Sequence, residues 1–319
     1  MIFEKQILNT YKSMMHKRCD DTETVCYFSP EDFPGLQVSS HSFCASAGHM
    51  LQGYFYQYEN PAADKLVVFD HGFGGGHRAY MTEIEILCAH GFRVFAYDHT
   101  GCMESGGETP NGLAQSLCDL HDCITMLKAE CGFAERDISV VGHSWGGFST
   151  LNITALHPEI SHIVAMAGFV CVEALIETFF PGVLKGYQKA IVAFEKERNP
   201  KFASFNAVHT LSKSKTKALL IYSDNDQMVK RSHYDMLKNN LEGRENIQFM
   251  LVSGRGHNPN YTQSAVKYLE EFTSARTKFT RKKNLSKEEK QAFVSSFDWK
   301  RMTQQDSTVW EIIFAHLKG

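Results

Sequence analysis

The fold is decided by the stretch Ile138-Ser139-Val140-Val141-Gly142-His143-Ser144-Trp145-Gly146, in which an apolar run leads into a Gly-x-Ser-x-Gly pentapeptide. The apolar run predicts a buried strand, and the residues that follow, up to Pro158, predict a helix. A strand that turns sharply into a helix holds the middle serine in a strained and exposed position. Small flanking residues are needed there because the two backbone segments pass closely. We therefore interpret the pentapeptide as a nucleophile elbow with Ser144 at its centre.

Candidate partners for this serine follow later in the chain. The apolar run 218–223 predicts a second buried strand and leads into Asp224 and Asp226. A carboxylate at the carboxyl end of a parallel strand is well placed to orient a histidine. After a further predicted strand over residues 247–252, a Gly-rich turn presents His257. The order Ser, Asp, His predicts a catalytic triad of Ser144, His257 and one of the two aspartates.

These features together resemble the α/β-hydrolases, and in particular the serine hydrolases among them, which include esterases, lipases and some aminopeptidases. The resemblance covers roughly residues 36–272 and rests on four blocks, namely residues 71–76, residues 97–105, the elbow, and the Asp226 and His257 pair. It implies an α/β fold, with a mostly parallel, doubly wound sheet, an N-terminal antiparallel hairpin and a small helical cap. The family spacing Asp-x-x-Val matches Asp226 and Val229, which favours Asp226 over Asp224. Met103 departs from the family pattern, where glycine is commoner.

The chemistry expected of such a site is acyl transfer. His257 would accept the proton of Ser144, and Asp226 would fix the tautomer of His257 and stabilise its charged form. The resemblance implies an oxyanion hole made by the backbone amides of Trp145 and Phe73, with Gly74 as the alternative to Phe73. Residues 72–78 complete neither of the common glycine-rich nucleotide-binding motifs, so we expect no nucleotide cofactor.

Composition narrows the function classes. The chain has 319 residues, of which 43% are hydrophobic, and its 33 basic and 36 acidic residues give a net charge of −3. This charge argues against a nucleic-acid or anionic-membrane partner, and we expect the basic stretch 276–290 to be a solvated linker. The nine cysteines lack Cys-x-x-Cys spacing, which argues against a disulfide framework. The N-terminus lacks the apolar core of a secretory signal. The apolar run 163–172 is shorter than the about 20 residues that span a bilayer. We therefore expect a cytoplasmic protein without a membrane span.

Alternating strand and helix signals predict the domain organisation. The core is expected over residues 36–167 and 212–275, beginning with an antiparallel hairpin around residues 36–38 and 51–56. The sheet pattern stops at residue 167, so residues 168–211 are predicted to form a helical cap insertion. Residues 276–319 are predicted to form a C-terminal helical tail, with a capping box over residues 286–289. Residues 1–35 form an N-terminal segment whose role the sequence leaves open.

The cap supplies apolar side chains that could cover a substrate, and we expect contacts from Phe179, Phe180, Tyr187 and Phe194. The leading hypothesis is a carboxylesterase acting on a small or medium apolar acyl group, with a small-molecule acyl substrate and no cofactor or metal. One alternative is an aminopeptidase or amidase in which Glu173 or Glu177 binds the substrate amine. Others are a non-catalytic ligand-binding protein of the same fold and an acyltransferase. The natural substrate and the oligomeric state remain open.

Overall fold

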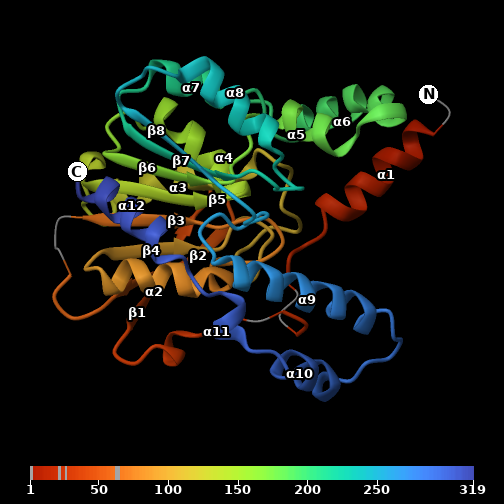
Figure 1. Cartoon of the computed structure of the whole chain (residues 1–319). Helices are drawn as coiled ribbons and strands as arrows, with labels where there is room; N and C mark the ends of the chain where they lie inside the picture. The colour runs from red at the N-terminus through yellow and green to blue at the C-terminus, as the bar shows by residue number, and fades with distance from the viewer. Residues whose placement is uncertain (1–2, 21–22, 26, 62–64) are drawn as a thin grey trace.

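The computed structural model describes residues 3–20, 23–25, 27–61 and 65–319 (Figure 1). Met1 and Ile2, which belong to the predicted N-terminal segment, lie outside the described residues, as do residues 21–22, 26 and 62–64.

A single sheet of eight strands, counted over the described ranges, runs through the molecule in the order β1-β2-β4-β3-β5-β6-β7-β8 (Figure 1). The pairs β1·β2 and β2·β4 are antiparallel, and the remaining neighbours are parallel. This confirms the predicted, mostly parallel sheet with an N-terminal hairpin. The strands are β1 Gln37–Cys44, β2 Met50–Gln57, β3 Leu66–Asp70, β4 Arg93–Tyr97, β5 Ile138–His143, β6 His162–Met166, β7 Lys217–Ser223 and β8 Ile247–Val252.

Helices cover both faces of the sheet, which explains why the central strands consist of continuous apolar runs. On one face, α2 (Met81–Ala89) and α12 (Ser307–Lys318) share a core cluster with Val67 and Phe69. On the other face, α3 (Gln115–Ala129), α4 (Trp145–Asn152) and α8 (Arg231–Leu241) share a cluster with Val68 and Val140. Short 3₁₀ segments occur at Pro30–Asp32, His77–Tyr80, Glu135–Asp137, Ile153–Ala155 and Gly182–Leu184.

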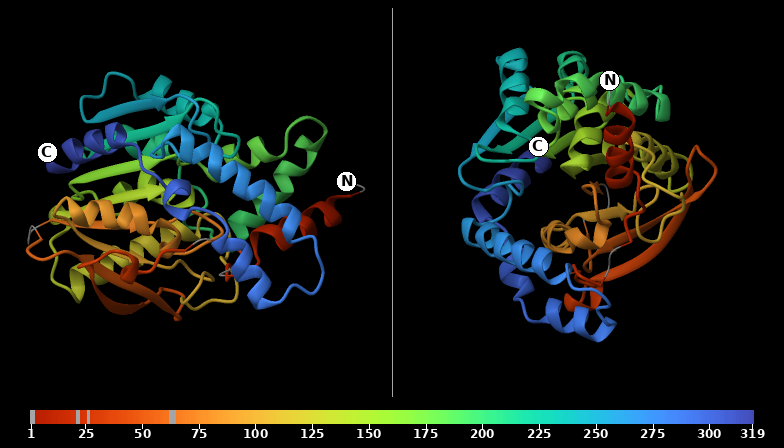
Figure 2. Two further views of the ribbon diagram at one scale, coloured as in Figure 1. Left: turned by 60° about the horizontal axis from the view of Figure 1, so that its bottom comes forward. Right: turned by 90° about the vertical axis from the view of Figure 1, so that its right-hand side faces the viewer.

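The segment between β6 and β7 is helical, with α5 Val172–Phe179, α6 Lys185–Arg198 and α7 Ala207–Lys213. The N-terminal helix α1 (Glu4–Met15) lies beside α6 in both views of Figure 2. Their contact centres on Tyr11, whose hydroxyl donates to Glu195 Oε1 over 2.6 Å. Helix α1 of the N-terminal segment, whose role the sequence leaves open, thus packs against the helical segment that the sequence predicts to be a cap.

The C-terminal part follows β8 with α9 Gln263–Phe279, α10 Lys287–Ser295, α11 Trp299–Met302 and α12. Helix α9 continues past residue 275, where the sequence analysis places a boundary, and ends only at Phe279. The capping box is present, because Glu289 N donates to Ser286 Oγ and Ser286 N donates to the Glu289 carboxylate. None of the helices in the described ranges combines the length and the apolar character needed to cross a bilayer.

Candidate active site

Ser144 stands at the carboxyl end of β5 with φ 57° and ψ −109°, a strained conformation for a residue with a side chain. The turn is tight because the start of α4 passes close to the end of β3. A Cβ atom on Gly146 would overlap the backbone carbonyl of Asp70, and one on Gly142 would overlap the carbonyl of Gly146. Only glycine fits at these two positions, which explains the Gly-x-Ser-x-Gly pattern.

A continuous hydrogen-bonded chain joins Ser144, His257 and Asp226. Ser144 Oγ lies 2.8 Å from His257 Nε2, and His257 Nδ1 lies 2.8 Å from Asp226 Oδ2. Asp226 is 3% exposed, and its other oxygen accepts from the amides of Met228 and Val229 over 2.7 and 3.1 Å. A carboxylate only accepts hydrogen bonds, so Nδ1 of His257 carries the hydrogen and Nε2 is free to accept the proton of Ser144.

Asp224, the competing carboxylate, points elsewhere. It accepts from Ser253 Oγ over 2.7 Å and from Gly254 N over 2.9 Å, and these hydrogen bonds lower its pKa. Asp224 therefore fixes the turn that leads to His257, whereas Asp226 contacts the imidazole itself.

Two backbone segments border the nucleophile. Trp145 begins α4, where amides have no partner within the helix. The segment after β3 passes equally close, since a Cβ atom on Gly72 would lie 3.3 Å from Ser144 Cβ. Gly72 N already donates to Tyr80 Oη over 3.1 Å, so the next amides, those of Phe73 and Gly74, are the candidates from this segment. The rings of Phe73 and Trp145 pack edge to face with centroids 5.1 Å apart.

Comparisons with known proteins agree with this architecture. The family model described as "Serine aminopeptidase, S33" matches residues 61–208. An esterase from Pyrococcus furiosus, Pf2001, superposes with a TM-score of 0.59 at 20% identity and covers 83% of this chain and 98% of its own. The α/β-hydrolase GrgF from Penicillium sp. sh18 gives 0.54 at 18% identity, with 77% and 98% covered. The chain has the α/β-hydrolase fold.

Curated relatives match the chain over a shorter span. Two proteins named "Putative carbamate hydrolase RutD", from Agrobacterium fabrum and Rhizobium rhizogenes, are each 29% identical to it, over 96 and 98 residues. The matches cover 30% of this chain and 34% and 35% of the relatives, so the chain spans about a third of the length of the curated relatives it matches.

Two residues of the site that sequence reasoning missed are Tyr80 and His143. His143 Nε2 lies 2.7 Å from the carbonyl oxygen of His257, so this nitrogen carries the hydrogen and donates. His143 Nδ1 then accepts from the Tyr80 hydroxyl over 2.9 Å, and the Tyr80 oxygen accepts from Gly72 N. Burial and the nearby His257 lower the pKa of His143 to about 3, which keeps it neutral. This series of hydrogen bonds connects the elbow to the backbone of His257 and to the segment after β3. A histidine within the pentapeptide was the only sequence signal for it.

The four cap residues expected to contact substrate lie in different surroundings. Phe180 and Phe194 pack against Tyr11 of α1, with ring centroids 6.2 and 6.5 Å apart. Phe179 borders the main core cluster, and Tyr187 is half-buried on α6. The structure therefore shows Phe180 and Phe194 joining the cap to α1, and substrate contact by any of the four remains a proposal.

The alternative amine-binding carboxylates also lie on the cap. Glu173 Oε1 forms an ion pair with Lys196 Nζ at 2.7 Å, and Glu177 is exposed. Over the part of the chain that the structure describes, no three His, Cys, Asp or Glu side chains are grouped so as to hold a metal ion.

Two hollows border parts of the site. A groove of about 900 Å³ begins at His257 and follows α9, where Met228, Val266 and Leu269 are the apolar members of a largely polar lining. Phe73 and Gly74 line a second hollow, of about 540 Å³, together with the end of α1. The first hollow thus reaches the histidine of the triad, and the second reaches the segment that supplies the candidate amide of Phe73.

Proposed function

We propose that this chain is a serine hydrolase that cleaves a carboxylic ester of a small or medium apolar acyl group. The observation that carries the proposal is the hydrogen-bonded chain from Ser144 through His257 to Asp226, with the serine held in a strained elbow. A serine hydroxyl becomes an effective nucleophile when an oriented base accepts its proton, and this arrangement supplies that base.

In the proposed reaction, Ser144 Oγ attacks the ester carbonyl while its proton moves to His257 Nε2. The amides of Trp145 and Phe73 donate to the oxyanion, and Asp226 stabilises the charged imidazole. Collapse of the tetrahedral intermediate breaks the bond to the alkoxy oxygen, which takes the proton from His257 and leaves as the alcohol. Water then adds to the acyl carbon while His257 takes one of its protons. The bond to Ser144 Oγ breaks, Oγ recovers that proton from His257, and the carboxylic acid leaves.

An apolar acyl group is supported by the lining of the groove that begins at His257. Met228 is 52% exposed beside this groove, and Val266 and Leu269 line it farther along α9. Val266 is buried, so Met228 is the exposed apolar side chain next to the reactive centre, and it gains contact when an apolar ligand covers it.

A second candidate is an aminopeptidase or amidase that uses the same acyl-enzyme. The matching family model, described as a serine aminopeptidase, favours this candidate. In that case Glu177, which is exposed and engaged in no ion pair that the structure of the described residues shows, or Glu173 would bind the substrate amine.

The test is steady-state hydrolysis of p-nitrophenyl esters of increasing acyl length beside the corresponding aminoacyl p-nitroanilides, with Ser144→Ala in parallel. A length optimum with esters, abolished in Ser144→Ala, is the expected result. Faster turnover of the anilides than of the esters would favour the peptidase over the esterase. In that case Glu177→Gln or Glu173→Gln should lower the turnover of the anilides but not that of the esters. Failure of a folded chain to turn over any substrate or to react with a fluorophosphonate would leave a ligand-binding protein.

A further inference from the structure

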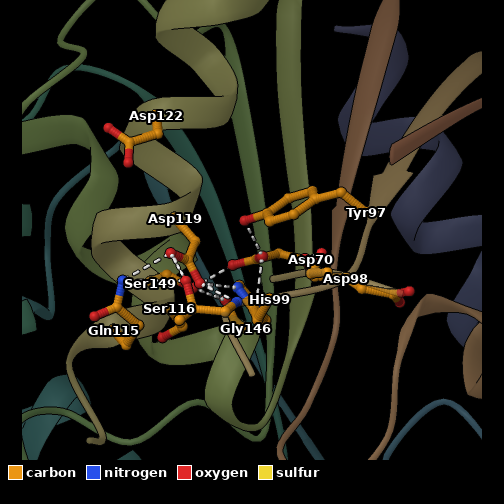
Figure 3. A network of polar contacts seen from close by, with 12 residues as sticks. Asp70, Tyr97, Asp98, His99, Gln115, Ser116, Asp119, Asp122, Gly146 and Ser149 are labelled. Atoms are coloured by element: carbon orange, nitrogen blue, oxygen red, sulfur yellow. Dashed lines mark hydrogen bonds and ion pairs between the residues drawn. The ribbon is translucent and has the colours of Figure 1, made fainter. Parts of the chain in front are cut away.

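Beneath the elbow lies a cluster of ionisable side chains that the proposed reaction does not use. His99 lies between Asp70 and Asp119, and all three side chains are fully buried (Figure 3). His99 Nε2 forms an ion pair with Asp70 Oδ1 at 3.0 Å, and His99 Nδ1 lies 3.2 Å from Asp119 Oδ2. Charges withdrawn from water this completely are retained only where partners compensate them, so the cluster needs an explanation.

The cluster brings three elements together at the edge of the sheet that carries Ser144. Asp70 is the last residue of β3, His99 follows the end of β4, and Asp119 lies on α3. The carboxylates have further donors. Asp119 accepts from Thr100 N and from Gln115 Nε2, each over 2.8 Å, and Asp70 accepts from Tyr97 Oη over 2.8 Å.

The charge state follows from these neighbours. Burial alone disfavours the charged ring, but the carboxylates of Asp70 and Asp119 outweigh it and raise the pKa of His99 to about 9. His71 is the opposite case, because burial and the positive charge of His99 lower its pKa to about 3. At neutral pH the cluster therefore contains an imidazolium between two carboxylates, with a neutral imidazole beside it.

One end of the cluster is attached to the segment that supplies the first candidate oxyanion amide. His99 N donates to His71 Nε2 over 3.0 Å, which leaves the hydrogen of His71 on Nδ1. That nitrogen donates to the carbonyl oxygen of Gly72 over 2.8 Å. The peptide unit between Gly72 and Phe73 is thus fixed through its carbonyl oxygen, and its amide is that of Phe73.

The other end is attached to the start of α4, which supplies the second candidate amide. The Ser149 hydroxyl, one turn after Trp145, contacts Asp70 Oδ2. Ser116 Oγ, on the same helix as Asp119, donates to the carbonyl oxygen of Trp145 over 3.1 Å. The indole of Trp145 packs on the His99 ring, with centroids 4.7 Å apart. Trp145 is therefore held through both its backbone and its side chain.

We propose that His99 is a positioning residue, through which the Asp70–His99–Asp119 cluster sets the separation of the Phe73 and Trp145 amides. The proposal rests on the proposed function, because only an acyl-transfer reaction uses these amides. An oxyanion hole works when its donors lie about 2.7–3.1 Å from the developing oxyanion, and loss of one donor costs about 10²–10³-fold in kcat. A misplacement of about 1 Å can cost about 10²-fold. Histidine suits the position because Nδ1 lies within hydrogen-bond distance of Asp119 and Nε2 lies 3.0 Å from Asp70 Oδ1, outside hydrogen-bond geometry, while the ring contacts the indole of Trp145.

The test compares His99→Gln with wild type for kcat and KM on the best ester, and for binding of a trifluoromethyl ketone, whose adduct with serine carries an oxyanion. We expect kcat to fall about 10–100-fold with KM nearly unchanged, and ketone affinity to fall by a similar factor. His157→Gln is the matched control. His157 is also a buried histidine beside a carboxylate, 3.4 Å from Glu135, but Glu135 precedes β5 at the opposite edge of the sheet. The control variant His157→Gln should therefore leave kcat within about twofold of the wild-type value.

A folded His99→Gln with kcat and ketone affinity within about twofold of wild type would overturn the proposal, as would equal losses in His157→Gln. If His99→Gln does not fold, Ser149→Ala decides, because it removes the hydroxyl that joins α4 to Asp70 and otherwise contacts only carbonyl oxygens of the same helix. A fall in kcat at constant KM is expected for it, and an unchanged kcat would overturn the proposal. Failure of the proposed function gives a different result, because the wild-type protein itself would then hydrolyse no acyl substrate. The inference about His99 would be overturned in that case as well.

Discussion

The contact between α1 and the cap allows a quantitative prediction for Glu195→Ala. Glu195 is fully buried and accepts from Tyr11 Oη and Leu113 N, each over 2.6 Å, with His16 Nε2 at 3.3 Å. Removing the carboxylate leaves the Tyr11 hydroxyl and the Leu113 amide without an acceptor. Each buried donor left unsatisfied costs about 1–3 kcal/mol, so for the two donors we expect the free energy of unfolding to fall by about 2–6 kcal/mol.

Two further variants divide this effect. Tyr11→Phe removes one hydrogen bond to a charged group without leaving an unpaired donor, and should cost about 1.5–3 kcal/mol. Lys196→Ala is the control, because Lys196 is the next residue but its ion pair with Glu173 is partly exposed, at 44% and 36%. Such exposed pairs contribute at most about 1 kcal/mol.

The measurement is urea unfolding followed by circular dichroism, with the midpoint and the slope reported for each variant. Limited trypsin digestion gives a local readout, since α1 contains Lys5 and Lys12, which should become accessible when the helix detaches. A Glu195→Ala variant within about 1 kcal/mol of wild type would show that the buried carboxylate does not hold α1. So would a loss no larger than that of Lys196→Ala.

Three other outcomes follow from the site. Asp226→Asn should keep the fold but lower kcat by about 10⁴-fold, since the amide favours the wrong tautomer of His257. Asp224→Asn should lower kcat by less than about tenfold. Equal effects of the two variants in the ester assay would contradict the assignment of Asp226. Gly146→Ala should lower the melting temperature sharply, because its Cβ would overlap the Asp70 carbonyl, and an unchanged melting temperature would refute the tight-turn argument. The stability that His99 contributes is full below its unfolded pKa of about 6.5 and is lost as the pH rises through about 9. The difference in unfolding free energy between wild type and a folded His99→Gln should therefore shrink from pH 6 to pH 9, and a constant difference would contradict the charged state.

Local sequence patterns were sufficient for the sheet. Apolar runs predicted β5, β7 and β8. For β5 and β7 the reason is that strands buried on both faces need apolar side chains throughout, whereas β8 is a partly exposed edge strand. The order of Ser144, Asp226 and His257 could also be read directly, since each follows a strand and the carboxyl ends of parallel strands meet at one edge. The structure brings these three together, and their catalytic role stays a proposal.

Contacts between distant residues could not be predicted in the same way. Tyr11 and Glu195 are 184 positions apart, and a glutamate followed by Lys196 near the end of an amphipathic helix gives no sign that it is buried. The His99 cluster was missed for a related reason, because its carboxylates come from a strand end and a helix and meet only in the folded sheet. Location in the cytoplasm, which composition suggested, stays a prediction.

Met103 shows how a departure from a family pattern is accommodated. It adopts φ 45°, the left-handed region in which glycine is favoured, so the family preference at this position has a conformational basis. Backbone and side-chain contacts compensate, since Met103 N donates to Cys19 O over 3.0 Å and the Arg18 guanidinium donates to Met103 O. The sequence revealed the departure but not the segment that supports it.

The position of α1 also has a consequence for biosynthesis. Its partner Glu195 is made 184 residues after Tyr11, which at about 5–20 residues per second is on the order of 10–40 s of translation. Closing a loop of that length costs roughly 5 kcal/mol of chain entropy, which the buried contacts around Glu195 repay only after α6 has folded onto the core. Helix α1 is made before the other described helices but is among the last of them to reach its place, and the helical segment it contacts acquires this support only late in the maturation of the chain.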